Sequence, residues 1–132
     1  PVQIAVGNAV PIRQISDSYD ESETVLQSLL TSGRTFAEFS DLTLELILSS
    51  APARIRSAYL SKTVSSLSDK DLNLLNTYFK CNMSLKDTCE KAFLHKNTLQ
   101  YRLNQIYHRC GYNPRSFQDA VVLYMALKLS GR

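Results

Sequence analysis

The sequence predicts a mainly α-helical fold, in which a helical bundle follows a partial α/β segment of strand, helix and strand. Apolar residues recur at helical spacing from about residue 69 to the end of the 132-residue chain. Near the N-terminus, apolar and polar residues instead alternate on either side of one helical stretch. Charge divides similarly: residues 62–132 hold eleven Lys or Arg against five Asp or Glu, whereas residues 1–61 hold four against seven.

The N-terminal segment begins with a predicted strand at residues 2–7, which runs into a turn at Gly7-Asn8. A helix of about fifteen residues is expected to start at Ser16 or Asp17 and to stop at Gly33. Its apolar side comprises Val25, Leu26, Leu29 and Leu30. Residues 35–39 alternate again as a second strand. Because three such elements do not form a stable sheet domain unaided, we expect the sequence to begin inside a larger domain or to borrow strands from another copy.

A connecting region is predicted between the two halves. Residues 41–50 read as a short helix that buries Leu42, Leu46 and Ile47, and Pro52 suits the first turn of a further helix. Ser-rich residues 62–69 mark the expected boundary, although Leu67 indicates that part of this stretch packs. The predicted division is therefore an α/β remnant at 1–48, a helical linker at 49–68 and a helical domain at 69–132.

The helical domain contains a predicted helix-turn-helix. Ser68 is a plausible cap for a supporting helix with Leu72, Leu75, Tyr78 and Phe79 on its apolar side. Ser84, with Asp87 in the first turn, caps the next helix, whose stripe is Leu85, Cys89 and Ala92. After a connector at 93–95, a further helix carries Leu99, Leu103, Ile106 and Cys110. Two short helices joined by a tight turn are what major-groove reading of DNA requires.

The outer face of the second of these helices is rich in amides and lacks carboxylates. At 100° per residue, Asn97, Tyr101, Asn104 and His108 lie opposite the buried stripe. Amides pair with adenine edges, and a basic residue near the helix start reaches guanine or phosphate. We expect base contacts from Lys96, Asn97, Gln100 and Tyr101, and phosphate contacts from Thr98 and Arg102. Asn104 is a further DNA-binding candidate on this face.

A last helix is predicted at 116–129, after a C-terminal stop at Gly111 and the break Asn113-Pro114. Residues 120–127 are apolar without interruption, so a single buried face does not account for all of them. Either the helix is buried on most sides, or its second face forms a dimer contact. We favour a homodimer through this helix, since reading two half-sites also requires one.

Residues 72–129 resemble the C-terminal helix-turn-helix domain of the PucR/CdaR family of bacterial transcription regulators, through LLNTYFKCNMSLKDTCEKAFLHKNTLQYRLNQI and SFQDAVVLYMALKL. The run HKNTLQYRL at 95–103 is the most specific part and is also similar to the recognition helix of the factor for inversion stimulation, which makes the expected bundle Fis-like. The resemblance implies DNA contacts at His95, Lys96, Thr98, Gln100 and Tyr101. Gln100 is a departure, because family members often carry Arg there.

The resemblance also implies that residues 1–48 are the tail of a GGDEF-like domain, and that a small-molecule effector is sensed by segments outside this sequence. No GG[DE]EF signature is present. The expected partner is double-stranded DNA.

The sequence shows no sign of a disulfide framework, a metal site, a catalytic site or a membrane span. Cys81, Cys89 and Cys110 do not have the spacing of a disulfide framework or a metal site, so we expect reduced thiols, no metal and no cofactor. No catalytic set surrounds His95 or His108, so we expect no enzyme. Without a signal peptide or an apolar run of membrane-spanning length, a cytoplasmic location and no membrane contact are expected.

Two alternative readings remain open on the residues alone. The helical hairpin could present its amides and Tyr101 to a protein partner instead of DNA. The less favoured alternative is an enzyme fragment, such as a nucleotide cyclase remnant. Steep salt dependence of binding would favour DNA, because neutralised phosphates release counterions.

Overall fold

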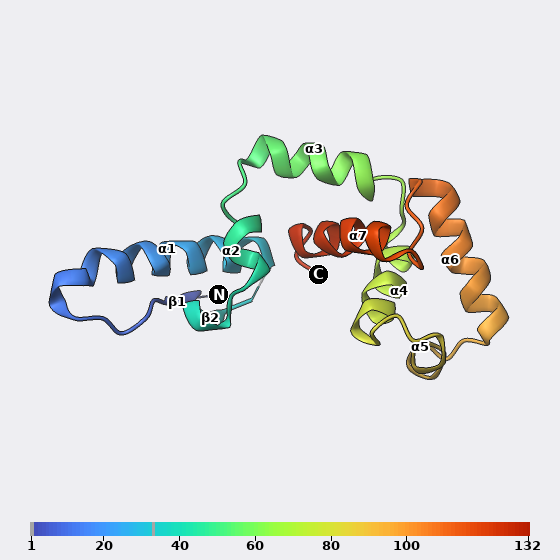
Figure 1. Ribbon diagram of the computed structural model, residues 1–132, viewed down its shortest axis with the longest axis horizontal. Coiled ribbons are helices and arrows are strands. Elements are labelled where there is room, and N and C mark those ends of the chain that lie inside the picture. The colour runs from blue at the N-terminus through green and yellow to red at the C-terminus, as the bar shows by residue number, and fades with distance from the viewer. Residues whose placement is uncertain (1, 33) are drawn as a thin grey trace. The chain divides into compact units, whose positions relative to one another are not determined.

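The computed structural model of the chain describes residues 2–32 and 34–132, and its predominantly helical character agrees with the prediction (Figure 1). The elements run in the order β1 (Ile4–Val6), η1 (Ile12–Gln14), α1 (Ile15–Ser32), β2 (Phe36–Glu38), η2 (Phe39–Asp41), α2 (Leu44–Leu48), α3 (Ala53–Thr63), α4 (Asp69–Lys80), α5 (Leu85–Ala92), α6 (Lys96–Cys110) and α7 (Phe117–Leu129). The chain divides into two compact units, of which the second is Arg56–Leu127.

The first unit contains the predicted strand, helix and strand. Strands β1 and β2 pair in parallel, with Ile4 opposite Phe36, and α1 packs against both strands. Val25 and Leu29 of α1 are buried with Ala37 of β2 in a small core. Parallel strands need a crossover connection, which α1 provides.

Several local expectations for this unit were wrong. Helix α1 begins at Ile15, directly after the 3₁₀ turn η1, so neither Ser16 nor Asp17 is its cap. Leu30 is 58% exposed, because the buried stripe follows Val25 and Leu29. In the next helix the buried residue is Leu48, whereas Ile47 is exposed. The predicted stop at Gly33 lies outside the described residues.

The second unit has a continuous core built from α4, α6 and α7, with the turn after α3. Its fully buried residues include Leu75, Leu99, Leu103, Ile106, Leu123 and Leu127. Those of α4 and α6 belong to the predicted apolar faces, whereas the sequence did not define which side of α7 is buried. Leu67 is also buried, as expected. The Tyr59 hydroxyl of α3 donates a hydrogen bond to the Val122 carbonyl at 3.0 Å. This core therefore fixes the buried side of α6, while the domain boundaries at 48 and 68 stay predictions.

Replacement of Leu103 by Ala tests the role of this core. The side chain is 1% exposed, so we expect a loss of about 2–5 kcal/mol from the free energy of unfolding, through lost transfer energy and the cavity left behind. Urea unfolding followed by circular dichroism measures it. The matched control is Leu30→Ala, which removes the same atoms from an exposed position and should cost far less. Equal losses for both variants would show that Leu103 is not a core residue.

Candidate nucleic-acid interface

Helix α5 leads into the turn of the helix-turn-helix. As predicted, Ser84 caps it, and the Ser84 Oγ accepts a hydrogen bond from the Asp87 N–H at 3.2 Å. Thr88 is fully buried, and its hydroxyl donates to the Ser84 carbonyl at 2.6 Å. The helix ends at Phe93, which adopts a left-handed conformation with φ 53° and is 94% exposed. The N–H groups of Phe93 and Leu94 both donate to the Cys89 carbonyl, which closes the turn before α6.

Helix α6 presents the predicted face to solvent. Leu99, Leu103 and Ile106 are at most 1% exposed, so the opposite side of the helix points outward. The exposed candidates for DNA contact are His95, Lys96, Asn97, Thr98, Tyr101 and Asn104. Gln100 and Arg102 are half-buried at the flanks. All eight candidates belong to one helix and its cap residue, and none of them is in the core.

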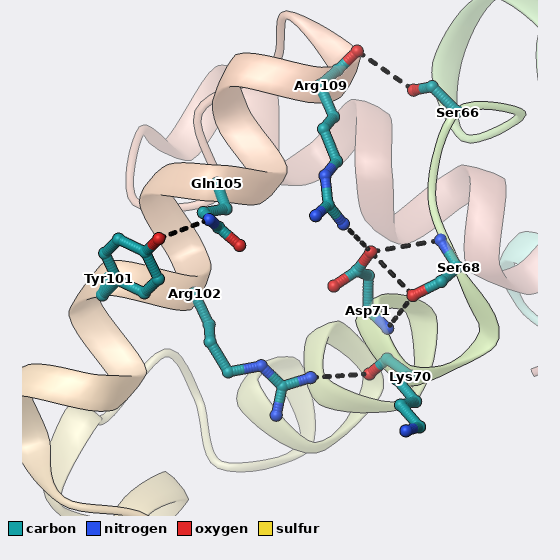
Figure 2. A network of polar contacts seen from close by, with 8 residues as sticks. All are labelled: Ser66, Ser68, Lys70, Asp71, Tyr101, Arg102, Gln105 and Arg109. Carbon is teal, nitrogen blue, oxygen red and sulfur yellow. Dashed lines mark hydrogen bonds and ion pairs between the residues drawn. The ribbon is translucent and has the colours of Figure 1, made fainter.

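Some candidate side chains already have partners within the chain (Figure 2). The Tyr101 hydroxyl accepts a hydrogen bond from Gln105 Nε2 at 2.7 Å. An Arg102 guanidinium nitrogen lies 3.4 Å from the Lys70 carbonyl, a long contact on an exposed edge. Because hydrogen bonds between exposed groups are exchanged for bonds to water at little net cost, Tyr101 and Arg102 remain available to a ligand.

Asn104 has a partner that the sequence did not suggest. Its Oδ1 accepts a hydrogen bond from Arg115 at 2.8 Å, across the loop between α6 and α7. Arg115 was not among the predicted contacts, because nothing in the helical pattern places a loop residue beside α6.

A polar network ties the C-terminal part of α6 to the start of α4 (Figure 2). Ser68 and Asp71 form the predicted capping site as a full capping box. The Asp71 carboxylate also accepts from Arg109 of α6 at 2.7 Å, and the Ser66 hydroxyl donates to the Arg109 carbonyl at 3.0 Å. This ion pair could not be read from the sequence, because its partners are 38 residues apart.

The network shifts the acidity of Asp71. Burial of the carboxyl favours its neutral form, but hydrogen bonds from Ser68 and the positive charge of Arg109 outweigh burial, so the pKa of Asp71 is lowered. A lowered pKa in the folded state stabilises the fold at pH values above the ordinary Asp pKa. That stabilisation is lost as the pH falls through the lowered pKa.

An apolar surface lies on another side of this unit. Phe117, Val121 and Tyr124 of α7 are 75%, 40% and 37% exposed. We call these three residues the α7 patch. They border a shallow hollow of about 390 Å³ whose other lining residues are Phe79, Asn82, Met83 and Ala120. Helix α7 thus has one buried side and one partly exposed apolar side, and a dimer contact on the exposed side stays a prediction.

The geometry is that of a helix-turn-helix with an outward-facing second helix, and comparison with known proteins identifies its type. Residues 72–129 match the PucR C-terminal helix-turn-helix domain. The match begins within α4 and includes α5, α6 and α7, so Arg109 lies inside it whereas Ser66, Ser68 and Asp71 precede it.

Related proteins agree with this match. Over 92% of its length, the chain is 32% identical to the uncharacterized protein YsfB of Bacillus subtilis, of which it covers 33%. Over 69% of its length, it is 32% identical to the carbohydrate diacid regulator of Escherichia coli, of which it covers 25%. The chain thus spans a third or less of these curated relatives.

A solved structure has a similar fold. The regulator of polyketide synthase expression from Bifidobacterium adolescentis aligns with a TM-score of 0.56 at 24% identity, over 87% of this chain and 48% of that one. The domain match and the Escherichia coli relative support a PucR/CdaR-type helix-turn-helix in this chain, and the solved structure supports the fold alone.

In the part of the chain that the structure describes, no three His, Cys, Asp or Glu side chains gather in a way that could hold a metal ion, and the three cysteines are free thiols. No helix in residues 2–32 and 34–132 has both the length and the apolar character that a membrane span requires.

The Asp71 network predicts a specific pH dependence. Asp71→Asn removes the charge that Ser68 and Arg109 stabilise, so we expect a loss of about 1–2 kcal/mol from the free energy of unfolding at neutral pH. Because the wild type loses this contribution in acid, the difference between the two proteins should shrink below about pH 4. Urea unfolding at a series of pH values measures it. Arg109→Gln, which keeps a donor without the charge, should weaken the same dependence. A constant difference at all pH values would contradict the assignment.

Proposed function

We propose that this chain is the DNA-binding part of a PucR/CdaR-type transcription regulator, which reads specific sequences with α6. The observation that carries the proposal is the outward face of α6, which displays amides, Tyr101 and Lys96 without a carboxylate, on a helix held in place by a PucR-type core. The eight candidates at 95–98, 100–102 and 104 are the proposed contacts, with Lys96, Asn97, Gln100 and Tyr101 at base edges.

The positive balance of residues 62–132 supports a polyanionic partner. Because the curated relatives extend well beyond the matched region, we place effector sensing in segments outside this sequence. The similarity to the carbohydrate diacid regulator of Escherichia coli favours a sugar diacid as the class of effector. We further propose a cytoplasmic protein without catalytic activity, and an N-terminal unit derived from a GGDEF-like domain.

Binding of the 132-residue chain to duplex DNA at a series of salt concentrations tests the proposal against a protein-interaction module. Each neutralised phosphate should contribute about −0.9 to the slope of log K against log salt. Binding that is absent at low salt, or that does not depend on salt, would favour a protein partner.

Base reading by α6 is expected to depend on Gln100 and Lys96. After selection from a random duplex library, the wild type should enrich one motif, and Gln100→Ala or Lys96→Ala should blur it at one position. The expected cost is about 1–3 kcal/mol for each lost base contact. Gln118→Ala makes the same chemical change on the exposed surface of α7 and should preserve the motif. If both α6 variants select the wild-type motif, another face reads the bases.

We propose that two copies associate through the α7 patch, because a two-half-site operator requires a dimer and this patch is the apolar side of α7 left exposed. Phe117→Asn should shift the protein toward monomer in sedimentation equilibrium and reduce the cooperativity of DNA binding. Phe93→Asn removes the same exposed ring from the turn before α6 and should leave association unchanged. Association that is insensitive to Phe117→Asn would exclude the α7 patch as the interface.

A further inference from the structure

The loop between α6 and α7 is fixed by hydrogen bonds and by burial of one of its residues. Gly111 ends α6 at φ 81°, a left-handed conformation that glycine adopts without steric cost. The Asn113 N–H donates to the Asp119 carboxylate at 2.9 Å, and the Ser116 N–H donates to the Asn113 carbonyl at 3.0 Å. Pro114 within this turn is fully buried. The backbone that carries Arg115 is therefore held at both sides.

The Arg115 side chain contacts the exposed face of α6. Its backbone N–H donates to Asn113 Oδ1 at 3.0 Å, while its guanidinium donates to Asn104 Oδ1 at 2.8 Å. Both Arg115 and Asn104 are exposed. Because an amide oxygen carries no net charge, this bond orients the guanidinium without neutralising it. The guanidinium N–H groups of Arg115 that do not bond to Asn104 can donate to an anion.

The position of Asn104 brings this cation to the flank of α6 opposite Arg102, where the helix's own cation, Lys96, lies about two turns nearer the N-terminus. Asn104 and Arg102 are two residues apart on the helix, and so point about 160° away from each other. A helix in the major groove has a phosphate backbone on each side. Arg102 lies at one flank, and Arg115 supplies positive charge toward the other.

We propose that Arg115 binds a DNA phosphate beside the groove entered by α6, and that Asn104 is a positioning residue for Arg115 and not a base reader. This inference rests on the proposed DNA-binding function. Planar guanidinium groups suit phosphate, because they donate two parallel hydrogen bonds to its oxygens. The DNA interface then extends beyond the helix-turn-helix into the loop before α7, and Asn104 contributes to DNA binding through Arg115.

The test measures binding of the 132-residue chain to a fluorescent duplex of random sequence over a series of salt concentrations. Arg115→Gln keeps a donor for Asn104 but removes the charge, so the slope of log K against log salt should become less steep by about 0.9. Arg115→Lys keeps the charge and should retain the wild-type slope. Arg54→Gln, the same change at an exposed position on α3, is the matched control and should have no effect.

The positioning role of Asn104 has its own readout. Asn104→Ala should weaken binding in the wild-type background but cause no further loss in the Arg115→Gln background, because the two residues act through one contact. The same motif should emerge from a random duplex library with and without Asn104→Ala. Independent, additive losses or an altered motif would overturn this role.

The outcomes separate the inference from the function on which it rests. If the wild type shows no salt-dependent binding to the duplex, the proposed function fails. If the wild type binds with a steep slope and Arg115→Gln has the same slope, DNA binding stands and the phosphate contact at Arg115 is excluded.

Discussion

Burial of one stripe of α6 is the constraint on which the rest of the second unit depends. Leu99, Leu103 and Ile106 are buried in one core with residues of α4, α5 and α7, and each contributes about 1.5–3 kcal/mol through apolar surface removed from water. A helix has only one buried side in such an arrangement, so the identity of the stripe decides which residues face outward. Core packing alone is therefore sufficient to expose the amide-rich face of α6.

Polar contacts further restrict the position and orientation of α6. Packing alone leaves a helix some freedom to slide and rotate, whereas the Asp71–Arg109 ion pair joins the C-terminal part of α6 to the capped start of α4. At the other end, the hydrogen bonds that close the turn at Phe93 set the direction in which α6 begins. Phe93 adopts a left-handed conformation that is costly for a bulky residue, which shows how strongly the neighbouring helices dictate this turn. Recognition helices need such support, because base contacts tolerate little displacement.

The sequence predicted the elements of the second unit well, because its signals are local. The caps at Ser68 and Ser84, the stop at Gly111 and the apolar stripe of α6 each arise within a few residues. Contacts between residues far apart in the sequence were not predictable. The ion pair between Arg109 and Asp71 and the hydrogen bond from Arg115 to Asn104 form only in the folded chain. Periodicity was weaker in the short helix α2, where Leu48 and not Ile47 is buried, since five residues define a face poorly.

The most direct test of the account is to map the backbone amide signals that shift when duplex DNA is added to isotope-labelled protein. We predict that the largest changes fall on residues 95–104 of the cap and first half of α6, with weaker changes near Arg115 and none in the α7 patch beyond those caused by dimerisation. Changes concentrated in α1, the strands or the α7 patch, with residues 95–104 unmoved, would contradict DNA reading by α6.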